Sequence, residues 1–200
     1  MGIMNIISRL KGGADGGGGG LAKNIVRVVS RENQDRLSPY LSHAPLSREK
    51  LLAVMGQIYT FRLAIGLYIL DDIARGEGGE GGGSGGGGEG NDIMALSNDI
   101  AEEFAEFMGW RGGVRNEYRV QLWIELGERT ERYRALFLDD LIDYESQRPP
   151  YFKRSAEEIL ISSGLDGDLE TMVRALSGYL VNVLPAFIAE MRDVILTKAG

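Results

Sequence analysis

The chain of 200 residues contains no cysteine and a single histidine, His43. Without cysteine it has no disulfide scaffold, no thiol nucleophile and no cysteine-ligated zinc or iron–sulfur site. One imidazole excludes a histidine-rich metal site, and it excludes a di-metal centre that needs Glu-x-x-His on two helices of one chain. No stretch alternates apolar and polar residues for long enough to predict a strand. We therefore expect an all-α protein without a cofactor.

Positive charge is scarce outside the first third of the chain. The formal net charge is −7, with an excess of four positive charges over residues 1–75 and eleven negative ones over 76–200. A nucleic-acid-binding protein needs a basic face that displaces counterions from phosphates, so no nucleic acid is expected as a partner. Asn5, Ser8 and Arg9 interrupt the first apolar stretch, which argues against a signal peptide. We expect a protein of the cytoplasm, or of a larger particle or complex, that is not secreted.

Glycine is the residue in clear excess. Of the 29 glycines, 18 lie in two tracts, at residues 12–20 and 76–90. Glycine destabilises a helix because it loses much backbone freedom and offers no side chain to pack. We expect the first tract to be a tether and the second a low-complexity loop. The predicted organisation is an N-terminal segment with its tether over 1–20, and one helical domain over 21–200 interrupted by the loop 76–90.

A short amphipathic helix is predicted ahead of the first tract. Its apolar residues follow the i, i+3, i+4, i+7 spacing of one helical face; they are Ile3, Ile6, Ile7 and Leu10. Isolated helices shorter than about 12–15 residues are marginal in water, so this segment is expected to dock on a partner. We favour a protein partner over a membrane surface, because one short helix with two cations binds lipid weakly.

Trp110 is a second candidate for partner contact. It lies in a glycine-containing turn between two predicted helices, beside Arg111. Aromatic side chains beside arginine often anchor interfaces. The same ring can instead hold together the two helices that the turn connects.

Apolar residues recur at helical spacing over most of the remaining chain. The predicted helices cover about 21–31, 47–74, 91–107, 114–144, 155–164 and 168–198. We expect about four long helices to form a bundle, with shorter N-terminal and connecting helices. Ser47 is a predicted N-cap, Ser155 and Glu158 form a predicted capping box, and the proline-containing stretch 37–46 is a predicted loop.

The helix predicted over 47–74 is apolar nearly all round and is expected to form the core, with Ile58 and Leu63 buried. Residues 51–70 are also long enough to span a membrane. However, Arg62 lies near the middle of that stretch, where an arginine costs about 2.5–3.5 kcal/mol on insertion scales. A buried core helix is therefore the favoured interpretation.

The most suggestive chemical pattern is an Asp-Asp-x-x-Asp string formed by Asp139, Asp140 and Asp143. Three carboxylates at this helical spacing can share Mg²⁺ bound to a diphosphate. The string resembles the motif of the all-α isoprenoid synthases, and Asp71 with Asp72 offers a partial second copy that lacks the third acid. The resemblance implies Mg²⁺-dependent diphosphate chemistry at these residues.

Two classes of function remain besides that enzyme. The leading hypothesis is a non-catalytic helical interaction or assembly protein. Such a protein would be a subunit of a homo- or hetero-oligomeric complex, possibly a large particle, and would use the tethered segment 3–11. The third hypothesis is a peripheral membrane-associated protein that docks through the same segment.

Overall fold

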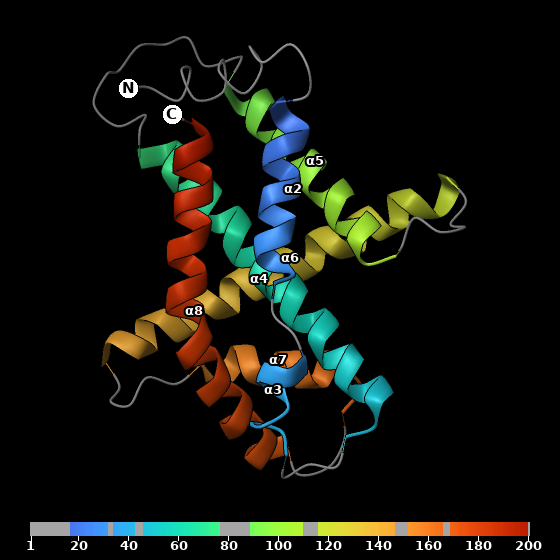
Figure 1. Ribbon diagram of the computed structural model, residues 1–200, viewed down its shortest axis with the longest axis vertical. Helices are drawn as coiled ribbons and strands as arrows, with labels where there is room; N and C mark the ends of the chain where they lie inside the picture. The colour runs from blue at the N-terminus through green and yellow to red at the C-terminus, as the bar shows by residue number, and fades with distance from the viewer. Residues whose placement is uncertain are drawn as a thin grey trace.

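The computed structural model describes residues 17–31, 34–42, 46–76, 89–109, 116–146, 152–165 and 169–199. This part of the chain is built from α-helices and contains no strand, which confirms the predicted all-α class (Figure 1). The helices are α2 (Gly17–Val29), α3 (Gln34–Leu37), α4 (Arg48–Gly76), α5 (Glu89–Phe107), α6 (Asn116–Ser146), α7 (Lys153–Ser162) and α8 (Leu169–Ala199). The segment 1–16, His43, Trp110 and most of the tract 76–90 lie outside the described residues.

The central helix is α4, as the sequence predicts. Residues 61–66 are buried in succession, so every side of the helix is covered at that level. It packs against α2, α3, α6, α7 and α8, and Tyr59 meets Phe107 of α5 with ring centroids 5.4 Å apart. Its predicted N-cap is confirmed, because the Ser47 hydroxyl accepts a hydrogen bond of 3.2 Å from the Lys50 amide.

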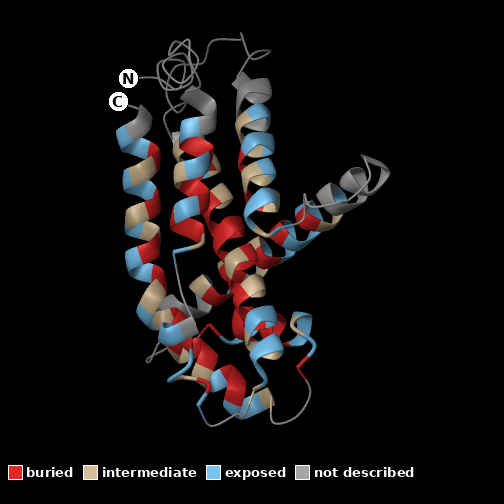
Figure 2. Ribbon diagram, turned by 45° about the vertical axis from the view of Figure 1, so that its right-hand side comes forward, coloured by how far each residue is buried: buried red, intermediate tan, exposed pale blue. Residues whose placement is uncertain are grey.

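α2 and α8 pack on α4, α5 packs on α2, and each of these three helices buries one face. On α2, the apolar residues spaced three and four apart turn inward; they are Leu21, Ile25, Val28 and Val29. α2 packs on α5, where Ile100 and Phe104 are buried, and on α8. Figure 2 shows the buried residues of these helices gathered along the lines where the helices meet, with exposed residues outside. α8 contains Pro185, which has no amide hydrogen for the helix ladder, and α8 bends along its length (Figure 1).

The predicted bundle of four long helices is not confirmed in that detail, because α6 runs across the others rather than along them (Figure 1). The crossing is built from aromatic rings. Phe61 of α4 lies edge-on to Tyr133 and Phe137 of α6, at 5.6 and 6.1 Å between centroids. Phe152, just before α7, stacks on Phe137 at 6.1 Å. Bulky rings in the middle of α6 fix one crossing point, which the periodicity of the sequence does not specify.

Several helix boundaries differ from the prediction. α2 begins at Gly17 and α5 at Glu89, so each helix extends into a glycine tract. Glycine lowers helix stability by roughly 1 kcal/mol per residue, and we infer that the packing of the next apolar turn offsets this cost. In α2 that turn contains Leu21 and Ala22, both buried. The short helix α3 is not predicted by the sequence at all.

The core assignment of α4 leads to a stability prediction. Replacing Ile58 or Leu63, both fully buried, with alanine leaves a cavity and is expected to lower the free energy of unfolding by about 2–5 kcal/mol. Leu52→Ala on the same helix, at an exposed position, is the matched control and is expected to change it by less than about 1 kcal/mol. Urea unfolding measures both, and equal effects at the three positions would contradict the assignment.

Candidate functional site

The middle residue of the acidic string predicted as a metal site is Asp140, and it stabilises the fold. Asp140 of α6 is 1% exposed. One carboxylate oxygen accepts a hydrogen bond of 3.2 Å from the Arg154 amide, and the other accepts one of 2.8 Å from the Ser155 amide. These amides belong to the first turn of α7, which has no partner for them within the helix. Asp140 therefore caps α7 from a different helix.

The predicted capping box at Ser155 and Glu158 is wrong for the same reason. α7 begins two residues earlier, at Lys153, with Phe152 as its N-cap and no side-chain cap from that residue. The Glu158 side chain does not return to the start of α7. It accepts hydrogen bonds from Arg132 at 2.6 Å and from the Ser162 hydroxyl at 2.8 Å instead. A buried carboxylate from α6 takes the place of the local cap that the sequence pattern indicates.

Burial raises the pKa of Asp140 above its ordinary value, because the charged form loses hydration. The hydrogen bonds from the Ser155 and Arg154 backbone act in the opposite direction, since they stabilise the carboxylate. The positive end of the α7 dipole adds to that stabilisation.

The remaining described acids of the two Asp-Asp pairs also face basic side chains. Asp139 lies 4.0 Å from the Arg154 guanidinium. Asp71 pairs with Arg134 of α6 at 3.0 Å, and Asp72 lies 3.6 Å from Arg192 of α8. The Asp143 side chain lies outside the described residues. Among the described residues, no group of three or more His, Cys, Asp or Glu side chains is arranged to hold a metal ion.

A second polar cluster lies where α4, α6 and α7 meet. Tyr133 donates a hydrogen bond of 2.9 Å to the Gln57 side-chain oxygen, and the Gln57 amide donates one of 3.3 Å to the Ser162 carbonyl. Burial raises the pKa of Tyr133 well above its ordinary value, so the phenol stays protonated and acts as a donor. The cluster links three helices by hydrogen bonds.

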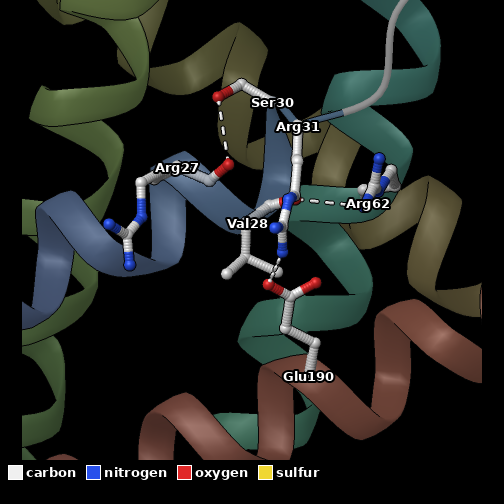
Figure 3. A network of polar contacts seen from close by, with 6 residues as sticks. All are labelled: Arg27, Val28, Ser30, Arg31, Arg62 and Glu190. Carbon is white, nitrogen blue, oxygen red and sulfur yellow. Dashed lines mark hydrogen bonds and ion pairs between the residues drawn. The ribbon is translucent and has the colours of Figure 1, made fainter.

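A third polar region centres on Arg62, which sequence analysis considers only as an argument against a membrane span. Arg62 is 4% exposed, and its guanidinium donates a hydrogen bond of 3.0 Å to the Val28 carbonyl in the last turn of α2 (Figure 3). The same group lies over the Phe187 ring of α8, 4.3 Å from its centroid. Carbonyls in the last turn lack partners within the helix, so a cation at this point both bonds one of them and faces the negative end of the α2 dipole.

Arg62 forms part of the wall of a hollow of about 350 Å³, which we call the arginine hollow. Arg31, just after α2, reaches across to form an ion pair with Glu190 of α8 (Figure 3). Asn182 donates hydrogen bonds to the Tyr40 hydroxyl at 2.9 Å and to the Gly178 carbonyl at 3.0 Å, which fixes the wall formed by α8. The described lining comprises Arg31, Arg36, Arg62, Asn182, Val183, Ala186, Phe187 and Glu190.

Two isoleucines on α6 are among the exposed large apolar residues of the described helices. Ile142 is 69% exposed and Ile124 is 49% exposed. They are 18 residues apart, which is five turns of a helix with ~3.6 residues per turn, so they share one face. Ala135, which is exposed, and Leu138, which is partly buried, lie on the same face near Ile142. We call these four residues the α6 face.

None of the predicted partner-binding residues is placed by the structure. Ile3, Ile6, Ile7, Leu10 and Trp110 all lie outside the described residues. Comparison with protein-family models, with curated proteins and with solved structures finds no match to this chain.

Two helices of the described part are long and apolar enough to span a membrane, judged by length and composition alone. They are Arg48–Ile73 and Leu169–Thr197. The core helix of a soluble protein has the same properties, and 61% of the first apolar window is buried inside the protein. The finding is therefore weak evidence for a membrane protein.

The capping role of Asp140 can be tested by its removal. Asp140→Ala removes the acceptor of two α7 amides, of which that of Ser155 is buried, and we expect the free energy of unfolding to fall by about 1–3 kcal/mol. Asp139→Ala, at the exposed neighbouring position, is the control and is expected to change it by less than about 0.5 kcal/mol. Chemical denaturation of both variants at neutral pH makes the comparison, and a larger loss in Asp139→Ala would rule out the cap.

Proposed function

We propose that this protein is a non-catalytic helical interaction or assembly protein that works as a subunit of a homo- or hetero-oligomeric complex. The observation that carries the proposal is the α6 face, where two large apolar side chains point into solvent on one side of a single helix. A partner that covers this side of α6 would remove both side chains from water, which is favourable.

The spacing of the α6 face suits a partner helix. With a rise of ~1.5 Å per residue, Ile124 and Ile142 are about 27 Å apart along the helix axis. Glu128 and Glu131 are exposed between them. A partner helix laid along this face would bury an apolar contact at each end and meet two carboxylates in the middle. Such an arrangement favours a partner with basic residues at its centre.

The free energy expected from burying the two isoleucines is enough for the α6 face to form part of an interface. Burying one exposed isoleucine is worth roughly 1.5–3 kcal/mol when it is fully removed from water. Two such side chains can serve as anchor residues, but a stable interface covers about 1,200–2,000 Å² in total. The rest of the interface must come from other surfaces, and the N-terminal segment with Ile3, Ile6, Ile7 and Leu10 is the second surface that we propose.

The diphosphate-enzyme hypothesis is not carried forward, because no observation favours it. Both carboxylate oxygens of Asp140 already accept backbone hydrogen bonds from α7, and Asp71 and Asp72 lie beside arginines of neighbouring helices. A metal ion would have to compete for each of these groups. The membrane-surface hypothesis depends on the segment 3–11 and remains the alternative for that segment.

The role of the α6 face can be tested by replacing its two isoleucines with a polar residue. The double variant Ile124→Ser/Ile142→Ser is expected to dissociate the complex, because it removes both apolar anchors. Native mass spectrometry of the tagged chain isolated from its source measures the mass of the complex, which should exceed the 21.9 kDa of one chain and fall to it in the variant.

Ile161→Ser is the matched control for that measurement. Ile161 is a similarly exposed isoleucine on α7, away from the α6 face, and its replacement should leave the complex intact. A mass of one chain for the unaltered protein at all concentrations tested, from its source and after purification, would refute the proposal.

The N-terminal segment gives a separate prediction. Removing residues 1–12 is expected to weaken the complex while leaving the thermal midpoint of the isolated chain within about 2 °C, because the segment acts on a partner. Size-exclusion chromatography with light scattering and thermal unfolding are measured on the same sample. An unchanged complex together with a less stable chain would instead assign the segment to the core of its own subunit.

A further inference from the structure

The C-terminal half of the α6 face carries an apolar strip on the side of the helix opposite the core. Ala135, Leu138 and Ile142 follow the spacing i, i+3, i+7 of one helical side. Tyr133, which packs on Phe61 of α4, is nine residues before Ile142, and nine residues are about two and a half turns. The strip therefore faces away from α4, and Ile142 in it is 69% exposed.

The N-terminal segment 3–11 has an apolar strip of the same length. Its residues follow the spacing i, i+3, i+4, i+7; they are Ile3, Ile6, Ile7 and Leu10. At ~1.5 Å per residue, the strip of the predicted helix and the strip from Ala135 to Ile142 are each about 10 Å long. The segment therefore has the length and the pattern to cover the C-terminal half of the α6 face.

The two surfaces carry opposite charges. The segment contains Arg9 and Lys11, and no Asp or Glu occurs in residues 1–14 of the sequence. On α6, Glu128 and Glu131 are exposed next to the apolar strip, on its N-terminal side. Complementary charges beside an apolar contact fix the register and direction of two helices more than they add affinity.

The arginines that flank these carboxylates on α6 form ion pairs with neighbouring helices. Arg132 pairs with Glu158 of α7 at 2.6 Å, and Arg134 pairs with Asp71 of α4 at 3.0 Å. Arg134 also lies 3.9 Å from Glu131, which is a long contact. Because the Glu131 side chain is exposed, a further cation can approach it from the solvent side.

The segment of the same subunit is too far away to cover this strip. From Lys11 to Gly17, a fully extended chain spans at most about 22 Å. α2 begins at Gly17 and is about 18 Å long. Val28, near its end, bonds Arg62, the residue after Phe61, on which α6 packs where it crosses (Figure 1). The strip lies beyond that crossing, on the far side of a helix about 10–12 Å wide. A segment that covers it therefore has to come from another copy.

We propose that the segment 3–11 of one copy binds antiparallel to α6 of a second copy, with Ile3 beside Ile142 and Leu10 beside Ala135. Lys11 then lies next to Glu131. The antiparallel direction also sets opposite ends of the two helix dipoles side by side. The two surfaces in contact are different, so each copy offers one segment and one face. This inference rests on the proposed function and identifies the partner of the α6 face as this same chain.

Disulfide cross-linking of full-length chains tests the contact. The chain has no cysteine, so cysteines introduced at two positions report only on the contact between them. Leu10→Cys and Ala135→Cys are mixed in equal amounts and oxidised, and we expect a disulfide-linked dimer on a non-reducing gel. Leu10→Cys mixed with Leu52→Cys, at an exposed position of α4, is the control and should give about tenfold less, since a disulfide needs Cα atoms within about 7 Å.

A chain that carries both Leu10→Cys and Ala135→Cys separates the two origins of the segment. Linked dimers or larger species are expected from it. A monomer with an internal disulfide would show that the segment covers its own subunit, and would overturn the proposal.

Charge reversal tests the register. Lys11→Glu and Glu131→Lys should each weaken self-association of the full chain about two- to fivefold, the range of an exposed ion pair. The two changes combined in one chain should restore it. Glu49→Lys, at an exposed position near the start of α4, is the control and should have no effect. Analytical ultracentrifugation measures the dissociation constants, and a double variant weaker than both single ones would contradict the register.

The outcomes distinguish this inference from the proposed function. A chain that forms no complex overturns both. A complex that Ile124→Ser/Ile142→Ser dissociates, but that gives no linked dimer between Leu10→Cys and Ala135→Cys, overturns this inference alone. The α6 face would then bind a different partner.

Discussion

The rest of the structure depends on one constraint, which is that α4 has no side that can be left in water. Six successive residues in its middle are buried, and that is possible only if neighbours cover the helix all round. α2, α3, α7 and α8 pack against it, and α6 crosses it (Figure 1). Because each neighbour contributes a single apolar face, the fold is a shell of amphipathic helices around an apolar one.

Two buried charged side chains lie at helix ends in that shell. One is negative and the other positive, and each is stabilised by hydrogen bonds to the backbone of another helix. Asp140 accepts hydrogen bonds from the amides that begin α7, and Arg62 donates one to a carbonyl near the end of α2. A carboxylate faces the positive end of one helix dipole, and a guanidinium faces the negative end of another. Each pairs a costly buried charge with backbone groups that have no hydrogen-bond partner within their own helix.

The parts of the fold that follow from local pattern could be predicted from the sequence. The long helices, the N-cap at Ser47 and the burial of Ile58 and Leu63 depend on spacing within one segment. The crossing of α6, the cap of α7 by Asp140 and the arginine hollow depend on residues far apart in the chain. Thus Ser155 and Glu158 match a capping box, yet a tertiary contact from α6 replaces it. Sequence spacing contains no information about which side chain of another helix reaches a given amide.

The acidic string at Asp139, Asp140 and Asp143 is compatible with a metal site and with a structural role until the neighbouring residues are known. Three acids at helical spacing are typical of a diphosphate-binding helix, but that spacing also places one acid inward and its neighbour outward. Asp140 is buried and bonds the amides of α7, whereas Asp139 is exposed beside the Arg154 guanidinium. The opposite holds for the arginines. Arg31, Arg36 and Arg62 form no motif in the sequence, yet they line one hollow from three separate elements: the residues after α2, the helix α3 and the middle of α4.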